Sequence, residues 1–208
     1  MKCDYSLYLV TDRAVLGSRD LCQAVEDALR GGVTLVQLRE KETSSRDFYQ
    51  IALALKDLTV KYQVPLIIND RLDIALAVDA GGIHIGQEDL PLQVARRILG
   101  PEKIIGYSVS NIEEAVYGEK YGADYLGAGP VYHTTTKVVT IQPLGAEGLR
   151  DIKKSVSIPV VGIGGINLDN VKEVKKSGAD GVAIVSGILG SPDPGRISGE
   201  LCAAWQEG

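Results

Sequence analysis

The sequence predicts a (β/α)8 barrel, or TIM barrel, formed as a single domain over residues 1–208. Three observations indicate this fold. The length of 208 residues suits one large α/β domain. Eight short apolar runs alternate with amphipathic stretches such as 47–62 and 111–121, which is typical of a parallel sheet with right-handed crossovers. Polar groups follow many of these runs, whereas an open doubly wound sheet would gather them at one switch point.

Glycines mark the entry into four of the predicted strands. Each of these glycines follows a helical pattern and precedes a buried run, where a left-handed helix cap is expected; they stand at 31–32, 81–82, 122 and 178. The eight predicted strands run from Leu7 to Val10, Leu35 to Leu38, Leu66 to Ile68, Ile83 to Ile85, Ile104 to Tyr107, Tyr125 to Ala128, Pro159 to Gly162 and Val182 to Val185.

The composition excludes several classes of protein. Apolar residues make up 45% and charged residues 24%, as in an ordinary globular protein, and no segment is long and apolar enough for a membrane span. A net charge of -5 argues against a broad nucleic-acid-binding face. Cys3, Cys22 and Cys202 are odd in number and lack a CxxC spacing, which favours a reducing cytoplasm. A homo-oligomer is compatible with all of this.

Cationic groups follow the second strand. Gln37, Arg39 and Lys41 have the same parity, so an extended backbone points all three to one side. Arginine offers a planar fork for phosphate and lysine a mobile charge. The alternative is a solvated charged turn, which is the simplest interpretation of Glu40 and Glu42.

Acidic groups follow the third and fourth strands. Asp70 and Asp89 would rise from neighbouring strands toward the same mouth of the barrel, where two carboxylates can hold Mg²⁺ beside a substrate phosphate. Either residue taken alone is more simply explained as a helix cap. The pair together favours a metal site.

The remaining strand ends carry hydroxyls and glycines. Ser108 follows the fifth strand, beside a helix-cap pattern at Ser110 and Asn111, and the long segment 129–145 opens with a loop of hydroxyls and one lysine. Gly162, Gly164 and Gly165 end the seventh strand, and Val185-Ser186-Gly187 ends the eighth. Barrel enzymes commonly bind phosphate at these two places through backbone N–H groups. A polar turn and simple glycine turns are the alternatives.

The two histidines are interpreted differently. His84 lies inside a strand between two isoleucines, so we expect a satisfied core residue and leave it out of the catalytic set. His133 lies in the long loop, where substrate or solvent is the expected partner. No Ser/His/Asp arrangement singles out a nucleophile.

With these residues in view, the chain resembles the thiamine phosphate synthase family. The resemblance extends from the first strand to the eighth, and its most specific parts are Gln37 to Lys41, Asn69-Asp70, Gly82 to Asp89, Thr134 to Lys137 and Val161 to Ile166. Such enzymes are (β/α)8 barrels that join a 4-amino-5-hydroxymethyl-2-methylpyrimidine diphosphate to a thiazole phosphate and release pyrophosphate. The resemblance therefore implies two small-molecule substrates, Mg²⁺ as cofactor, and neither nucleic acid nor membrane as partner.

The resemblance also implies roles for individual residues. The pyrimidine diphosphate would be bound by Gln37, Leu38, Arg39, Glu40, Lys41, Asn69, Ser108 and Lys137. The thiazole phosphate would be bound by Thr134, Thr135, Thr136, Gly165, Val185 and Ser186, and Mg²⁺ by Asp70 and Asp89. Lys137, Arg39 and Lys41 would be catalytic, because they neutralise the charge that grows on the leaving pyrophosphate while an electron-rich pyrimidine stabilises its cation.

Two departures and three rival interpretations accompany this resemblance. His133 stands where the family usually has proline, and the segment 138–142 is more apolar than expected, so loop order or turnover could differ. A thiazole tautomerase on the same barrel would keep the phosphate-binding site at Gly165 and Ser186. It would not need Asp70, Asp89 and Lys137 together. A non-catalytic regulator that binds phosphometabolites and a generic barrel isomerase also stay open.

Overall fold

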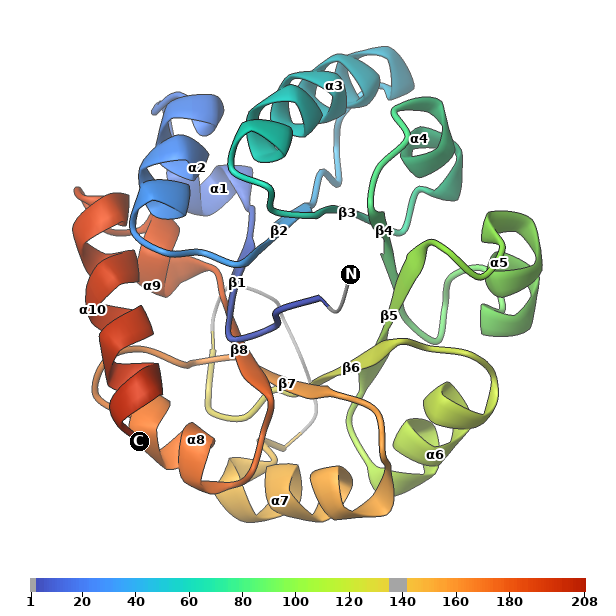
Figure 1. Ribbon diagram of the computed structural model, residues 1–208, viewed down its shortest axis with the longest axis vertical. Helices are drawn as coiled ribbons and strands as arrows, with labels where there is room; N and C mark the ends of the chain where they lie inside the picture. Colours follow the sequence, from blue (N-terminus) through green and yellow to red (C-terminus); the bar gives the residue numbers. More distant parts are fainter. Residues whose placement is uncertain (1–2, 135–141) are drawn as a thin grey trace.

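The computed structural model describes residues 3–134 and 142–208. Its eight parallel strands close into a barrel in the order of the chain, β1 to β8, so the predicted (β/α)8 barrel is confirmed (Figure 1). The strands are β1 (Leu7–Val10), β2 (Leu35–Leu38), β3 (Leu66–Asn69), β4 (Gly82–Ile85), β5 (Ile104–Val109), β6 (Tyr125–Ala128), β7 (Val160–Ile163) and β8 (Gly181–Ile184). Every predicted strand overlaps one of these.

The helices surround the strands as an outer ring (Figure 1). They are α1 (Arg13–Leu16), α2 (Leu21–Arg30), α3 (Ser45–Lys61), α4 (Leu72–Ala77), α5 (Leu92–Leu99), α6 (Ile112–Lys120), α7 (Gly145–Ser155), α8 (Val171–Lys176), α9 (Ser186–Leu189) and α10 (Pro194–Glu207). The last helix, α10, packs against α2 and α8 and so closes the ring between the two ends of the chain. Within the described ranges, no helix combines the length and the apolar character that a bilayer span requires.

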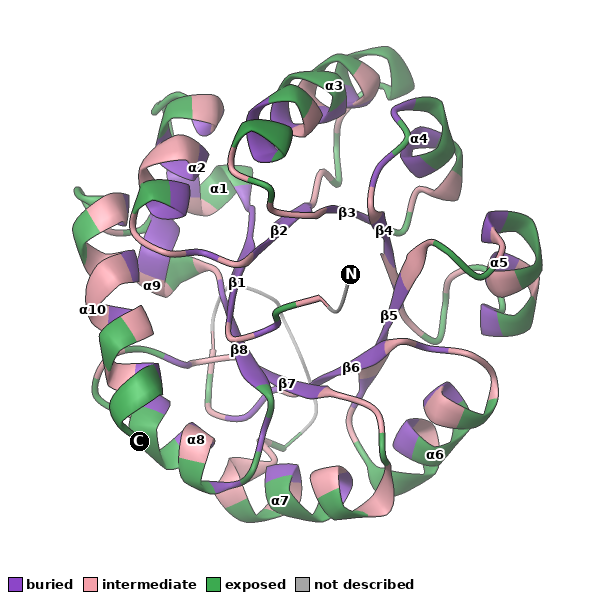
Figure 2. Ribbon diagram, in the orientation of Figure 1, coloured by how far each residue is buried: buried purple, intermediate pink, exposed green. Residues whose placement is uncertain are grey.

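Two layers of apolar side chains hold the barrel together. The larger lies between the strands and the helices, whose inner faces are buried while their outer faces are exposed (Figure 2). The smaller lies inside the barrel and contains Tyr8, Leu35, Ile67, Tyr125 and Val161. This interior packing leaves the carboxyl ends of the strands as the place where polar groups can gather.

The glycine signals were correct at three of the four helix-to-strand turns. Gly32, Gly122 and Gly178 have φ values of 101°, 97° and 90°, which is the left-handed region that glycine enters without a steric cost. At the fourth turn the prediction was wrong: Asp79, with φ 51°, takes the left-handed position, and Gly81 does not. Aspartate tolerates this conformation better than most residues, because its short side chain can bond locally.

Candidate active site

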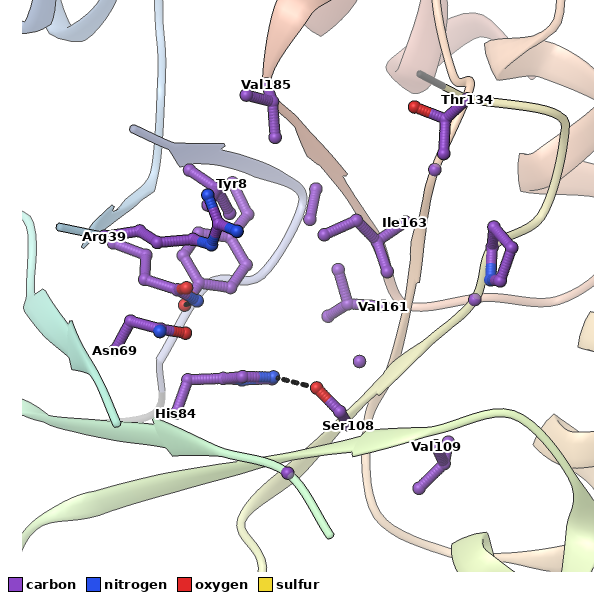
Figure 3. A pocket seen from close by; sticks show the side chains of 18 of the residues that line it. Tyr8, Arg39, Asn69, His84, Ser108, Val109, Thr134, Val161, Ile163 and Val185 are labelled. Carbon is purple, nitrogen blue, oxygen red and sulfur yellow. Dashed lines mark hydrogen bonds between the residues drawn. The ribbon is translucent and has the colours of Figure 1, made fainter. Parts of the chain in front are cut away.

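One cavity of about 620 Å³ opens at the carboxyl ends of the strands. Figure 3 shows its two sides: Arg39, Asn69, His84 and Ser108 on one, and the apolar side chains of Val161, Ile163 and Val185 on the other. Most of the residues predicted from the sequence line it, namely Gln37, Arg39, Lys41, Asn69, Asp70, Asp89, Ser108, Thr134, Gly165, Val185 and Ser186. The structure therefore brings residues from seven of the strand ends, spread along the sequence, into one site.

The guanidinium of Arg39 is held in place before any ligand binds. Its Nη1 donates to Asp12 Oδ2 at 2.7 Å, and its backbone N–H donates to Thr11 Oγ1 at 3.0 Å. Asp12 is itself fixed, because it caps α1 by accepting from the backbone N–H groups of Ala14 and Val15. Sequence reasoning gave neither Thr11 nor Asp12 a role, although both follow the first strand at the same mouth of the barrel.

Leu38 and Glu40 stay predicted substrate-binding residues, but they are not among the residues that line the cavity. Leu38 is fully buried in the outer apolar layer. The Glu40 carboxylate pairs with Arg13 at 2.9 Å and is only 3% exposed, so it is not the solvated group that was the simplest interpretation. Alternation along the strand turns both side chains away from Gln37, Arg39 and Lys41. Any contact with substrate would have to use their backbone groups.

Asp70 and Asp89 stand together on the acidic side of the cavity. Burial, and then the neighbouring charge and hydrogen bond of Asp89, raise the pKa of Asp70 to about 6, although Arg39 and Lys41 act in the opposite direction. Asp89 Oδ2 accepts from the backbone N–H of Gly86 at 2.7 Å. Two like charges held side by side are the arrangement that a bound cation relieves.

The alternative interpretation of these two acids as helix caps is wrong. Within the described chain, α4 begins after Arg71 and α5 after Pro91, and neither helix receives a side-chain cap bond. Asp70 instead occupies a left-handed position, with φ 61°, directly at the end of β3. The carboxylates are therefore available to a ligand.

The donor set fits Mg²⁺ better than a metal held by protein alone. Among residues 3–134 and 142–208, no group of three or more His, Cys, Asp and Glu side chains could hold a metal ion. Mg²⁺ usually takes one or two carboxylates and completes its shell with waters and substrate phosphates. Asp70 and Asp89 could supply that pair of ligands.

The histidine that we expected to be a satisfied core residue also faces the cavity. The ring of His84 is bonded at both nitrogens, to Tyr125 Oη and to Ser108 Oγ, each at 2.9 Å. The structure thus brings a serine and a histidine together, which no sequence spacing indicated. The third member is a neutral phenol where acyl-transfer triads have a carboxylate, so the pair does not form a serine nucleophile of that kind.

The opposite end of the site is a hollow beside the ends of β7 and β8. It is lined by His133, Thr134, Gly165, Ile166, Asn167, Ser186 and Gly187. Gly165 has φ 66°, and a Cβ there would stand 2.5 Å from the backbone oxygen of His133. Glycine is required at this point, and its backbone lies open to a ligand. His133 is exposed here, as expected for a residue that meets substrate or solvent.

Three of the predicted site residues, Thr135, Thr136 and Lys137, lie outside the described residues, as do residues 138–141 of the apolar segment 138–142. Their assignment stays a prediction. The helix-cap pattern after the fifth strand is confirmed, since Asn111 caps α6 by accepting from the backbone N–H of Glu114 at 2.8 Å. Ser108 is separate from that cap and lies in β5 with its hydroxyl on His84.

Comparison with known proteins gives consistent results. Residues 7–188 match the family model for thiamine monophosphate synthase. The chain is 54% identical to a thiamine-phosphate synthase of Desulfitobacterium hafniense (strain Y51), over 99% of this chain and 100% of that protein. It is 59% identical to one of Clostridium acetobutylicum, over 89% and 88%. A solved thiamine phosphate pyrophosphorylase from Pyrococcus furiosus is 45% identical and superposes with a TM-score of 0.90, over 99% of this chain and 97% of that one.

Proposed function

The chain belongs to the thiamine monophosphate synthase family, and we propose that its cavity joins a hydroxymethylpyrimidine diphosphate to a thiazole phosphate. In this reaction the bond between the pyrimidine methylene carbon and the diphosphate oxygen breaks. The thiazole nitrogen supplies the electron pair for the new carbon–nitrogen bond, and pyrophosphate leaves. The products are thiamine phosphate and pyrophosphate.

One observation supports this proposal most strongly: a single cavity has two ends that suit two different anions. Arg39, Lys41, Asp70 and Asp89 lie at the ends of β2 to β4, while the glycine hollow lies at the ends of β7 and β8. A diphosphate with its metal suits the first end, because both cations and carboxylates are needed there. A monophosphate suits the second, where Gly165 exposes its backbone beside the hydroxyls of Thr134 and Ser186.

The residues at the diphosphate end would act by electrostatics. Arg39, already oriented by Asp12, and Lys41 would bind the diphosphate and lower the energy of the charge that develops as it leaves. We propose the same role for Lys137. Asp70 and Asp89 would hold Mg²⁺, which when bound supplies further positive charge at the leaving group. Because an electron-rich aminopyrimidine can carry the resulting cation, the protein would not need to provide a nucleophile.

The apolar side of the cavity complements this chemistry. Val161, Ile163 and Val185 face the polar side across the space in which the substrates would meet (Figure 3). These side chains would exclude water from a reactive carbon that any bound water would otherwise attack. We propose that the two aromatic rings of the substrates pack against them.

The rival functions are less well supported. A thiazole tautomerase has no need for a diphosphate end, yet Arg39, Asp70 and Asp89 line this cavity together. A binding regulator or a generic isomerase would not explain the match to the family model over residues 7–188. The similarity to enzymes named thiamine-phosphate synthase favours the transferase.

A substrate-omission assay tests the proposal. The protein is incubated with both substrates and Mg²⁺, and then with each component left out, and thiamine phosphate and pyrophosphate are measured. We expect both products with the complete mixture and neither when any component is missing. Isomerised thiazole without pyrimidine would identify a tautomerase, and binding without either product would identify a regulator.

The proposal extends to the cellular compartment and the binding partners of the protein. Cys3, Cys22 and Cys202 are all free thiols, which is compatible with a reducing cytoplasm. We propose that the partners are these two small molecules, with neither nucleic acid nor membrane involved. A homo-oligomer stays open, and size-exclusion chromatography with light scattering would determine it.

A further inference from the structure

A continuous chain of hydrogen bonds crosses the interior of the barrel. It begins at Gln37 on β2 and ends at Ser108 on β5, and it passes through side chains of β1, β6 and β4. The four bonds are Gln37 Nε2 to Tyr8 Oη at 2.7 Å, Tyr8 Oη to Tyr125 Oη at 2.8 Å, Tyr125 Oη to His84 Nδ1 at 2.9 Å, and His84 Nε2 to Ser108 Oγ at 2.9 Å. Both of its ends line the cavity.

Two glycines make room for this chain. His84, Gly106 and Tyr125 are partners in register on three neighbouring strands, so the two rings meet over the glycine between them. A Cβ on Gly106 would stand 2.2 Å from Tyr125 Cζ and 2.4 Å from His84 Nδ1. A Cβ on Gly127 would stand 2.9 Å from His84 Cε1. The sequence therefore keeps side chains out of the space that the hydrogen bonds occupy.

Burial ensures that each phenol keeps its proton. Tyr8 and Tyr125 are almost wholly inaccessible to solvent, at 1% and 0% exposure. Burial raises the pKa of both hydroxyls well above the ordinary value for tyrosine. Each hydroxyl therefore has one hydrogen to donate, and a buried hydrogen left without an acceptor would be costly.

Counting these hydrogens gives the chain a direction. The Gln37 amide nitrogen can only donate, so the Tyr8 hydroxyl accepts a hydrogen bond from it. The Tyr8 hydroxyl in turn donates a hydrogen bond to Tyr125. Tyr125 then donates to Nδ1 of His84, which must be unprotonated there and carry its hydrogen on Nε2. That hydrogen goes to Ser108 Oγ, and the hydroxyl hydrogen of Ser108 is left to point elsewhere.

We propose that Tyr8, Tyr125 and His84 are positioning residues that set the polarity of the two ends of this chain. With its nitrogen engaged by Tyr8, Gln37 presents its carbonyl oxygen as an acceptor. The oxygen of Ser108 is engaged by His84 (Figure 3), so Ser108 presents its hydroxyl hydrogen as a donor. A substrate that offers a donor to Gln37 and an acceptor to Ser108 is favoured, and one with the opposite pattern is rejected because buried groups would be left unpaired.

The proposal rests on the proposed function in one respect, since the pyrimidine diphosphate is taken as the molecule that meets both ends. Aminopyrimidines carry both a donor, the amino group, and acceptors, the ring nitrogens. The chain would thus align the pyrimidine before its diphosphate leaves. The direction of the chain, by contrast, can be measured without any substrate.

Nitrogen NMR of the protein labelled with ¹⁵N-histidine measures that direction. The protein contains two histidines, so the His133→Gln variant assigns the signals of His84 unambiguously. We expect a neutral His84 ring at neutral pH with its hydrogen on Nε2. A hydrogen on Nδ1, or a fully protonated ring, would reverse or break the chain and overturn the proposal. Because this experiment needs no turnover, it remains decisive even if the proposed reaction is wrong.

A kinetic experiment tests the consequence for substrate. Tyr125→Phe removes the link while keeping the ring, and we expect kcat/KM for the pyrimidine diphosphate to fall about tenfold, with a shifted His84 tautomer. Tyr5→Phe is the matched control, because its ring packs on Tyr125 at 4.9 Å between centroids while its hydroxyl lies outside the chain. That variant should keep wild-type kinetics.

A double-mutant cycle separates positioning from stability. Once Ser108→Ala has removed the last member of the hydrogen-bond chain, Tyr125→Phe should cost little further activity. The loss in the double variant should therefore be smaller than the sum of the losses in the two single variants. Fully additive losses, or wild-type kcat/KM in Tyr125→Phe, would overturn the proposal. If Tyr125→Phe does not fold, Tyr8→Phe breaks the same chain one link earlier and carries the same kinetic expectations, while the bond from Tyr125 to His84 remains.

Discussion

Asp12 Oδ2 lies 2.7 Å from Arg39 Nη1, and both side chains are largely buried at the edge of the cavity. The pair joins two strand ends that are adjacent in the barrel, because Asp12 follows β1 and Arg39 follows β2. A carboxylate that also caps a helix is rigid. The arginine fork is therefore oriented before any ligand arrives, which would lower the entropy cost of binding the proposed diphosphate.

This relationship predicts the effect of Asp12→Asn. Asparagine can still cap α1 but no longer attracts the guanidinium, so the fold should persist while Arg39 loses its fixed orientation. We expect kcat/KM for the pyrimidine diphosphate to fall about tenfold, or ~1.4 kcal/mol. Steady-state kinetics measure this loss. Unchanged or improved kinetics would mean that Arg39 binds the diphosphate equally well when released from Asp12.

A second prediction concerns the stability of the protein without metal. The pKa of Asp70 is raised to about 6 in the folded state from an ordinary value of 3.8. Because the folded protein holds this proton more tightly than the unfolded chain, protonated Asp70 contributes to stability. The contribution is complete below pH 3.8 and is lost as the pH rises through about 6. Asp70→Asn should then stabilise the metal-free protein at pH 7.5 by roughly 1 kcal/mol, a figure reduced because the side chain is exposed to the cavity.

Thermal unfolding at pH 4.5 and pH 7.5 measures this effect, and we expect the stabilisation to be larger at the higher pH. Asp73→Asn is the matched control, because Arg71 lowers the pKa of Asp73, and its loss should have the opposite sign. An Asp70→Asn variant less stable than wild type at pH 7.5 would show that the two carboxylates do not repel each other as described.

The same carboxylate predicts how metal use depends on pH. If Asp70 is a ligand, a proton on its carboxylate would compete with Mg²⁺, and with a pKa of about 6 roughly one tenth of the Asp70 side chains are ionised at pH 5. The Mg²⁺ concentration for half-maximal activity should therefore rise about tenfold between pH 7.5 and pH 5. Titration of Mg²⁺ at both pH values measures it. A concentration independent of pH would argue against Asp70 as a ligand.

A fourth prediction tests the glycine hollow. Gly165→Ala places a Cβ 2.5 Å from the backbone oxygen of His133, so this backbone should shift and weaken binding of the thiazole phosphate. Gly145→Ala is the matched control: its φ of 63° is nearly the same as the 66° of Gly165, but no atom lies within 4 Å of its Cβ. In both variants, an alanine in the left-handed conformation costs about 1 kcal/mol of stability. We expect KM for the thiazole phosphate to rise at least tenfold more in Gly165→Ala than in the control.

The sequence predicted the barrel well because strand ends and helix-to-strand turns leave local signals. Apolar runs predicted the strands, a glycine after a helix predicted three of the four turns, and parity predicted that Gln37, Arg39 and Lys41 line one cavity. The sequence could not predict which side chains at the strand ends would contact one another across the barrel. Asp12 with Arg39, and Tyr8 and Tyr125 with His84, are far apart in sequence, and their meeting depends on strand order and register. Glu40 was misjudged for the same reason, since its partner, Arg13, follows another strand.

The most direct test of the two-ended cavity is a measurement of both KM values in two variants. Arg39→Gln should raise KM for the pyrimidine diphosphate about tenfold or more and leave KM for the thiazole phosphate within about twofold. Gly165→Ala should give the reverse pattern. If both variants raised the same KM, or if each raised both to the same extent, the two anions would not occupy separate ends of one cavity, and the account would be contradicted.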